Sequence, residues 1–248
     1  MSDLEPALVR PLIRGRFGEP YLYAVETPST QQLLLTSDFP EGAVAVAEHQ
    51  TAGRGRLGRA WSDTPTRALL CSVMLRPPAS PDLAQLSLVA GLAVAEAVDA
   101  VAGVASTVKW PNDVLLDGRK LAGILLEGDG GVVVCGIGIN VNQLREELPT
   151  GTRTAPTSLA TASGHAHDRG AILAELLDRF ARRYDEWSAG GLSSMIDALA
   201  DRDAILGRSV RVGEVTGVAA GIEPDGALRI RTASGAVHLA VSGEVTLL

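Results

Sequence analysis

The stretch GRGRLGR at residues 53–59 decides between several folds, because it matches two different phosphate-binding patterns. Its glycines have the spacing of the dinucleotide-binding pattern G-x-G-x-x-G. Its first and last glycines also have the spacing of the P-loop pattern, but Arg59-Ala60 stands where Lys-Ser/Thr is required. The residues around the stretch therefore have to determine which fold, if either, it belongs to.

The residues that follow argue against both folds. A dinucleotide-binding loop opens a helix, and an acidic residue follows about twenty positions later. Here the turn-forming segment RAWSDTPTR (59–67) follows, and RPPAS (76–80) contains no acidic residue. A P-loop needs a lysine for the phosphates and a hydroxyl for Mg²⁺, and Arg59-Ala60 supplies neither. We therefore expect neither of these two phosphate-binding folds.

Two interpretations of GRGRLGR remain. It is either an exposed surface loop without a ligand or a loop that holds an anion. Its arginines alternate with its glycines, and both residue types favour the second interpretation. Glycine lets the backbone approach a ligand closely, and arginine offers planar, permanently charged donors for carboxylate and phosphate groups. We interpret the stretch as a mobile lid that orders over an anionic ligand.

The hydrophobic pattern of the whole chain predicts an α+β fold. Strand-like segments lie at residues 21–26, 42–50, 68–76, 106–128 and 131–142. Helix-like segments begin after Ser29 or Thr30, cover the apolar run 83–101, and follow Asp168. From about Gly207, short strands separated by glycine turns indicate a small β domain. We expect the first domain at 1–204 and the β domain at 205–248.

Composition and charge exclude several functional classes. The 248 residues carry a formal net charge of -7 and no block of lysine and arginine, which argues against binding to DNA. The N-terminus contains no apolar signal segment and the run 83–101 is interrupted by charged residues, so we expect no membrane association. Cys71 and Cys135 lie in apolar runs, which predicts buried thiols, no disulfide and a cytoplasmic location.

A hairpin is predicted between KWPNDV (109–114) and GRKLAGILLE (118–127), because Asp117-Gly118 is a strong two-residue turn signal. A regular register places Asp113 opposite Ala122 and brings Lys120 onto the same face as Asp113. A carboxylate and an amine in this position could hold Mg²⁺ and a phosphate. The alternative is a surface ion pair, which contributes about 0–1 kcal/mol to stability.

The strand segment GIGINVN (136–142) carries alternating glycines. These glycines would allow a flat ligand to lie against the backbone, with Asn140 hydrogen-bonded to a base or ribose. Packing of the sheet against other protein groups explains the glycines equally well, so both interpretations stay open.

Five motifs occur in an order that resembles the biotin protein ligase family, also called biotin–[acetyl-CoA-carboxylase] ligase. They are TPSTQ (27–31), EHQTAGRGRLGRAW (48–61), KWPNDV (109–114), RKLAGILLE (119–127) and GIGINVN (136–142). The resemblance implies a mixed-sheet ligase core flanked by helices and a C-terminal SH3-like β domain. It also implies that biotin and MgATP give biotinyl-5′-AMP, from which biotin passes to a lysine of a biotin carboxyl carrier protein domain.

The resemblance implies a set of site residues. Those expected at biotin are Ser29, Thr30, Gln31, Gln50, Arg54, Gly55, Arg56, Lys120, Gly123 and Gly136. Those expected at ATP are Arg54, Arg56, Arg59, Trp61, Lys109, Asn112, Lys120, Asn140 and Glu244. Arg56 and Lys120 are the expected catalytic residues, and Asp113 is the expected ligand of Mg²⁺.

The chain departs from the family pattern in two places. Larger members carry an N-terminal DNA-binding domain, and this chain starts almost at the ligase core, so we expect no repression through its own DNA binding. The family can also place a basic residue where Leu248 stands. Two rival functions are a lipoate or octanoate ligase or transferase of related fold and a sensor that binds without catalysis. The resemblance leaves a homodimer open.

Overall fold

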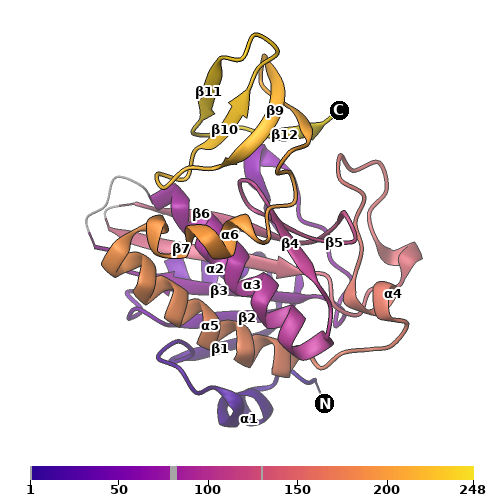
Figure 1. The fold of residues 1–248 in the computed structure, drawn as a ribbon. Helices are drawn as coiled ribbons and strands as arrows, with labels where there is room; N and C mark the ends of the chain where they lie inside the picture. Colours follow the sequence, from indigo (N-terminus) through magenta and orange to yellow (C-terminus); the bar gives the residue numbers. More distant parts are fainter. Residues whose placement is uncertain (1, 79–82, 130) are drawn as a thin grey trace.

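The computed structural model describes residues 2–78, 83–129 and 131–248, which form a mixed α/β core and a small β domain (Figure 1). The core contains a seven-stranded sheet in the order β1-β2-β3-β7-β6-β5-β4. The first pair, β1 and β2, is parallel, and the remaining pairs are antiparallel. The α+β fold class predicted from the sequence is confirmed.

The core strands match the strand-like segments of the sequence. They are β1 (Tyr21–Thr27), β2 (Val44–Gln50), β3 (Leu69–Leu75), β4 (Ser106–Lys109), β5 (Asp113–Leu116), β6 (Arg119–Asp129) and β7 (Val132–Ile139). The central strands β2 and β3 are buried along most of their length, which explains why they read as nearly continuous apolar runs.

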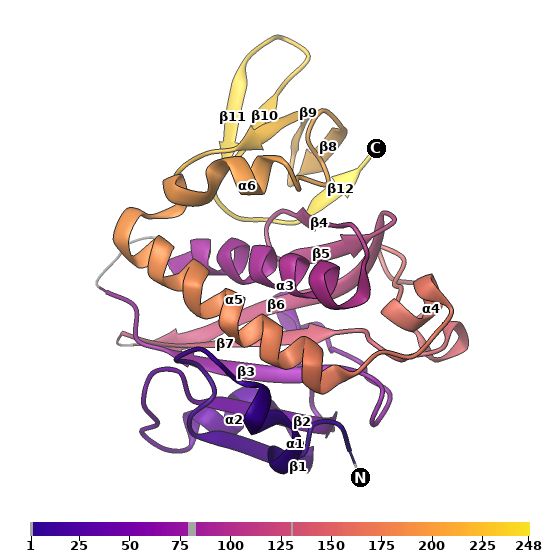
Figure 2. The same ribbon diagram turned by 60° about the horizontal axis from the view of Figure 1, so that its bottom comes forward.

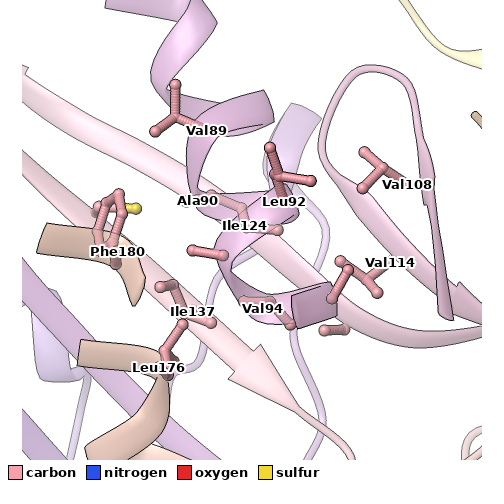
Figure 3. Close-up of a cluster of buried hydrophobic side chains, with 14 of the residues drawn as sticks. Val89, Ala90, Leu92, Val94, Val108, Val114, Ile124, Ile137, Leu176 and Phe180 are labelled. Carbon is pink, nitrogen blue, oxygen red and sulfur yellow. The ribbon is translucent and has the colours of Figure 1, made fainter. Parts of the chain in front are cut away.

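Two long helices cover one face of the sheet, α3 (Leu86–Ala102) and α5 (Arg169–Gly190) (Figures 1 and 2). Their apolar side chains form the main core with the facing strands, as Figure 3 shows for Leu92, Ile137 and Phe180. The predicted cap Asp168 accepts a hydrogen bond from the amide of Ala171 at 3.0 Å. This packing explains why the segments that form α3 and α5 carry so many apolar residues.

The segment Leu83–Ala102 is long and apolar enough to cross a membrane by length and composition, and 67% of its most apolar window is buried inside the protein. Core helices of globular proteins have the same properties. We interpret it as the central core helix, in agreement with its contacts to α5 and the sheet.

The short helix α2 (Thr30–Leu35) covers the opposite face of the sheet. Ser29 is its N-cap, and the Ser29 hydroxyl accepts a hydrogen bond from the Gln31 amide at 3.3 Å. Leu34 packs there with a small cluster from the strands, including Ala45 and Met74. The N-terminus of α2 is thereby fixed above the middle of the sheet.

The remaining helices are short. They are α1 (Pro6–Val9), α4 (Leu159–Ser163) and α6 (Ile196–Ala200), and 3₁₀ turns occur at Arg10–Leu12, Arg56–Gly58, Leu83–Gln85, Arg145–Glu147 and Leu192–Met195. The α4 helix lies in the connection between β7 and α5, which carries part of the site described below.

The C-terminal domain is a five-stranded sheet in the order β11-β10-β9-β8-β12. Its strands are β8 (Ser209–Val212), β9 (Val215–Ile222), β10 (Leu228–Arg231), β11 (Val237–Ala240) and β12 (Val245–Leu247). The indole nitrogen of Trp110 in the core donates a hydrogen bond to the Gly226 carbonyl at 2.9 Å. This contact fixes the β domain next to the segment that carries KWPND.

Candidate active site

A cavity of about 540 Å³ lies between the α2 face of the sheet, residues 53–61, and the loop that precedes β12. Every residue that the sequence analysis placed at biotin, ATP or metal lines this cavity. The residues come from α2, β2, β4 to β7 and the C-terminal domain, and they lie more than 200 positions apart at the extremes, Ser29 and Glu244. The structure therefore brings the predicted site residues together, while their individual roles remain predictions.

One end of the cavity is lined by uncharged hydrogen-bonding groups. Ser29, Thr30 and Gln31 at the start of α2 are buried there. The Gln50 carboxamide oxygen accepts hydrogen bonds from the Thr30 amide at 2.8 Å and from the Thr30 hydroxyl at 3.1 Å. This end contains paired polar groups and no charged side chain among these four residues, so it suits a neutral polar ring.

Gln31 closes this end against the sheet. Its amide nitrogen donates to the carbonyls of Leu125 at 3.2 Å and Val134 at 3.4 Å. A Cβ added at Gly136 would lie 2.7 Å from the Gln31 side chain, so only glycine leaves room for this arrangement. The glycine at 136 therefore accommodates a protein side chain beside the cavity.

Trp61 occupies the place where the alternating glycines had suggested a flat ligand. A Cβ added at Gly138 would lie 2.5 Å from the Trp61 indole, and one at Gly123 would lie 3.0 Å from it. The flat group that lies on the Gly138 backbone is thus an indole of the protein. The packing alternative explains Gly138, and the proximity of Trp61 to adenine stays a prediction.

The predicted lid (residues 53–59) lies in a short hairpin that extends to Trp61. The Trp61 amide donates to the Gly53 carbonyl at 2.9 Å, and the Gly55 amide donates to the Arg59 carbonyl at 2.7 Å. Arg54 forms an ion pair with Glu127 on β6 at 2.7 Å. One of the lid arginines thereby attaches the lid to β6 beside the cavity.

The other two lid arginines also line the cavity. Arg56 donates to the Asn112 side-chain oxygen at 3.1 Å and to the Gly243 carbonyl at 3.4 Å. Arg59 forms an ion pair with Glu244. The lid therefore touches the core and the C-terminal domain at once.

The β5–β6 hairpin differs from the predicted register by one β-bulge. Leu115 pairs with Lys120 as expected, but the register then shifts and Asp113 pairs with Gly123, where the sequence analysis had placed Ala122. The extra residue of a bulge has no sequence signature in this segment. The bulge keeps the Lys120 side chain close to Gly123, within 3.2 Å of the position of an added Cβ.

Asp113 and Lys120 form an ion pair, which was the alternative to separate roles at Mg²⁺ and phosphate. The Lys120 ammonium lies 2.6 Å from a carboxylate oxygen of Asp113, and it lies 5.7 Å from the centre of the Trp61 ring. Both side chains line the cavity, so the pair is not an ordinary surface ion pair. The pair therefore places a carboxylate among the cations of the cavity.

The cationic end is formed by Arg56, Arg59, Lys109, Lys120 and Arg153. Burial lowers the pKa of the Lys109 ammonium, and Asp113 partly opposes this shift. Burial likewise lowers the pKa of the Arg56 guanidinium, again opposed by Asp113. Cations that are partly removed from water and only partly neutralised attract a polyanion such as a triphosphate.

Arg153 is a residue of this site that the sequence analysis did not identify. It forms an ion pair with Glu244 at 3.2 Å and donates to the Thr246 hydroxyl at 2.9 Å. Its neighbour Thr154 accepts a hydrogen bond from the Lys109 ammonium at 3.0 Å. The segment 145–167 looked like a polar connection, and only the tertiary fold brings it to the cavity.

Asn140 lines the cavity, but its side chain is also used within the protein. Its amide nitrogen donates to the Thr157 carbonyl at 3.0 Å, and its oxygen accepts a hydrogen bond from Gln143 at 3.0 Å. These bonds attach the segment 145–167 to the end of β7. A contact between Asn140 and the nucleotide stays a prediction.

We expect Lys109→Met to weaken ATP binding about tenfold or more, because a hydrogen bond to a charged group contributes about 1.5–3 kcal/mol. The same change should raise the free energy of unfolding at neutral pH, since it removes a buried ammonium. Folding lowers the pKa of Lys109, because burial disfavours its charged form. Below the pKa in the folded protein, the buried ammonium therefore destabilises the folded state to the full extent. This destabilisation disappears as the pH rises to the pKa of an exposed lysine.

Urea unfolding of both proteins at neutral pH and near the ordinary lysine pKa measures this difference, and calorimetric titration measures ATP affinity. The gain in stability should shrink at the higher pH. Equal ATP affinities for the two proteins would contradict the placement of Lys109 at the phosphates.

Two protein-family descriptions match the chain. The biotin/lipoate A/B protein ligase family matches residues 22–143, and the biotin protein ligase C-terminal domain matches residues 205–248. The second match covers the five-stranded domain whose Glu244 reaches the cavity. The two matches together cover the strands, the lid and the β domain of the site, while Arg153 in the segment 145–167 lies outside both.

Individual proteins agree with these matches. A biotin–[acetyl-CoA-carboxylase] ligase of Mycobacterium tuberculosis is 40% identical over 198 residues, which is 76% of this chain and 73% of the relative. One from Paracoccus denitrificans is 36% identical over 86% of this chain and 94% of the relative. The biotin protein ligase of Aquifex aeolicus, solved in complex with biotin and ATP, has a TM-score of 0.84 at 33% identity, covering 93% of this chain and 99% of that one. The chain therefore belongs to the biotin protein ligase family.

Proposed function

We propose that this protein is an ATP-dependent, AMP-forming biotin ligase that activates biotin to biotinyl-5′-AMP and transfers biotin to a lysine of a carrier domain. One observation carries the proposal: a single cavity has an uncharged, hydrogen-bonding end at α2 and a cationic end at the lid. The first end suits biotin's ureido ring, and the second suits its carboxylate together with a triphosphate.

The uncharged end discriminates against the rival substrates lipoate and octanoate. Neither of them has a ureido group to satisfy the polar side chains of Ser29, Thr30 and Gln50, which are held near the sheet. Unpaired buried polar groups are costly, and sites built for hydrogen bonds reject analogues that lack them. A lipoate or octanoate ligase is therefore not favoured.

The chemistry of activation explains the cationic end. An oxygen of the biotin carboxylate forms a bond to the α-phosphorus of ATP, and the bond from that phosphorus to the bridging oxygen of pyrophosphate breaks. Two anions must approach each other, so Arg56 and Lys120 reduce the repulsion and stabilise the developing charge. Their contacts with Asn112 and Asp113 hold them in place beforehand.

The cavity has a donor suited to the Mg²⁺ of MgATP. Magnesium prefers oxygen ligands and commonly takes one or two protein carboxylates, with phosphate and water oxygens completing its coordination. Asp113 and Glu244 are carboxylates that line the cationic end. Within the described residues no group of three or more His, Cys, Asp and Glu side chains could hold a metal alone. Asp113 would hold Mg²⁺ together with the phosphates, where the ion would neutralise phosphate charge.

The lid would protect the product of the first step. The mixed anhydride of biotin and AMP is prone to hydrolysis, and a hairpin held across the cavity limits access of water. The neutral amine of the carrier lysine then attacks the acyl carbon, a C–N bond forms, and AMP leaves with the electrons of the broken C–O bond. No side-chain nucleophile is needed in either step.

We further propose that the carrier is the biotin carboxyl carrier protein domain of a biotin-dependent carboxylase, and that the protein works in the cytoplasm. The buried free thiols of Cys71 and Cys135 support a reducing compartment. Burial raises the pKa of Cys71 to about 12, which keeps this thiol protonated and unreactive. A homodimer stays a proposal that the ligand-dependent oligomeric state would test.

Biotin-dependent exchange of labelled pyrophosphate into ATP tests the activation step. We expect exchange with biotin and MgATP, no exchange without biotin, and none with lipoate or octanoate. Exchange that depends equally on lipoate would support the rival function, and binding of biotin without any exchange would identify a sensor.

A further inference from the structure

Ser72 is a fully buried serine in the middle of β3, where its neighbours along the strand are apolar. It pairs with Ala45 of β2 on one side and with Gly136 of β7 on the other. Directly paired residues project from the same face of a sheet, so Ser72 lies on the cavity face next to Gly136. A hydroxyl buried at this position requires a hydrogen-bond partner.

The partner of Ser72 is Thr30, whose hydroxyl oxygen lies 2.7 Å from the Ser72 hydroxyl oxygen. Thr30 in turn lies 3.1 Å from the Gln50 carboxamide oxygen, which can only accept hydrogen bonds. The Thr30 hydroxyl therefore donates to Gln50. Its oxygen is then free to accept, and Ser72 donates to it.

The backbone amide of Thr30 fixes the orientation of the Gln50 carboxamide. Because the backbone amide of Thr30 is only a donor, the Gln50 atom that lies 2.8 Å from it is the oxygen. The Gln50 nitrogen faces the other way, and a Cβ added at Gly53 would lie 3.2 Å from it. Within the described part of the chain no acceptor is bonded to this nitrogen, and Gln50 lines the cavity.

We infer that Ser72 is a positioning residue for ring recognition, because it holds Thr30 and thereby presents the Gln50 N–H₂ group to a carbonyl oxygen of the ligand. This inference rests on the proposed function, in which that acceptor is the ureido carbonyl of biotin. Ser72 does not line the cavity, so it acts through Thr30 and Gln50. The hydrogen bonds that link Ser72, Thr30 and Gln50 make the site selective for a ring that carries a hydrogen-bond acceptor.

The test is the variant Ser72→Ala, in which only the hydroxyl is removed. We expect biotin affinity to fall about three- to tenfold, the range of a neutral hydrogen bond. The KM for biotin should rise, whereas kcat and the KM for ATP should stay unchanged. In a Thr30→Val background, Ser72→Ala should have no further effect, because the hydroxyl that links Ser72 to Gln50 is already absent there.

A matched control is Ser106→Ala. Ser106 is also a buried serine of the core sheet, but it does not line the cavity, and the acceptors within reach of its hydroxyl are the Asp99 carboxylate at 2.8 Å and the Ala95 carbonyl at 3.2 Å. This variant should lose thermal stability and keep the affinity for biotin. It separates a general effect of a lost buried hydroxyl from an effect on ring recognition.

Calorimetric titration with biotin distinguishes the outcomes. If the wild-type protein binds biotin and Ser72→Ala binds it with the same affinity, the inference about Ser72 is overturned and the proposed function stays intact. A parallel loss of ATP affinity in Ser72→Ala would also overturn it, since that result indicates general damage. If the wild-type protein binds no biotin, the proposed function itself is contradicted.

Discussion

Arg56→Ala is expected to reduce the rate of adenylate formation about 10²–10³-fold and to release biotinyl-5′-AMP into solution. Loss of one preorganised donor that stabilises developing charge costs about 2.7–4 kcal/mol. Arg56 is such a donor, because its contacts with Asn112 and Gly243 hold the guanidinium at the cationic end of the cavity. Without it the lid also loses a contact with each domain, so the adenylate is retained less well.

Quenched-flow measurement of adenylate formation and filtration of the bound adenylate test both parts of this result. Arg56→Lys keeps the positive charge but loses the forked geometry of the guanidinium, so its activity should lie between that of the wild type and that of Arg56→Ala. Arg76→Ala serves as the control, because Arg76 pairs with Asp38 on the surface, remote from the cavity lining. An Arg56→Ala protein with wild-type rate and retention would contradict the function of the lid as an anion clamp.

Lys120→Ala is expected to reduce the rate of biotin-dependent pyrophosphate exchange about 10²–10³-fold, because it too removes a preorganised donor that stabilises developing charge. The ammonium belongs to the cationic end of the cavity, where we expect the carboxylate of biotin to meet the α-phosphate. Its removal also leaves the Asp113 carboxylate, 2.6 Å away in the wild type, without its partner. An unpaired carboxylate repels both substrates, which adds to the loss.

The double variant Lys120→Ala/Asp113→Asn separates these two contributions. If repulsion by Asp113 dominates, the double variant should recover part of the exchange. Arg119→Ala is the matched control, since Arg119 is the adjacent cation on β6 and does not line this cavity. Normal exchange in Lys120→Ala would remove Lys120 from the catalytic residues.

Local patterns in the sequence predicted most of the core. Alternating and β-branched residues marked the strands, and Asp168 and Ser29 marked the starts of α5 and α2 through their capping bonds. The Asp117-Gly118 turn predicted the hairpin and the shared face of Asp113 and Lys120, which form an ion pair. These features depend on neighbours in sequence, which is why they could be inferred without a structure.

The features that were missed depend on contacts between distant segments. The bulge in β6, which shifts the partner of Asp113, has no turn residue to mark it. Arg153 reaches Glu244 only because the β domain docks onto the core. The indole of Trp61 takes the space above Gly138 that could equally have held a ligand. A motif resemblance locates site residues but does not give these arrangements.

The most direct test of biotin ligase activity is the mass of a biotin carboxyl carrier protein domain after incubation with this protein, biotin and MgATP. We expect the intact carrier to gain the mass of one biotinyl group on a single lysine, and omission of ATP or replacement of biotin by lipoate to leave its mass unchanged. A carrier that stays unmodified with active reagents, or one that is lipoylated instead, would contradict it.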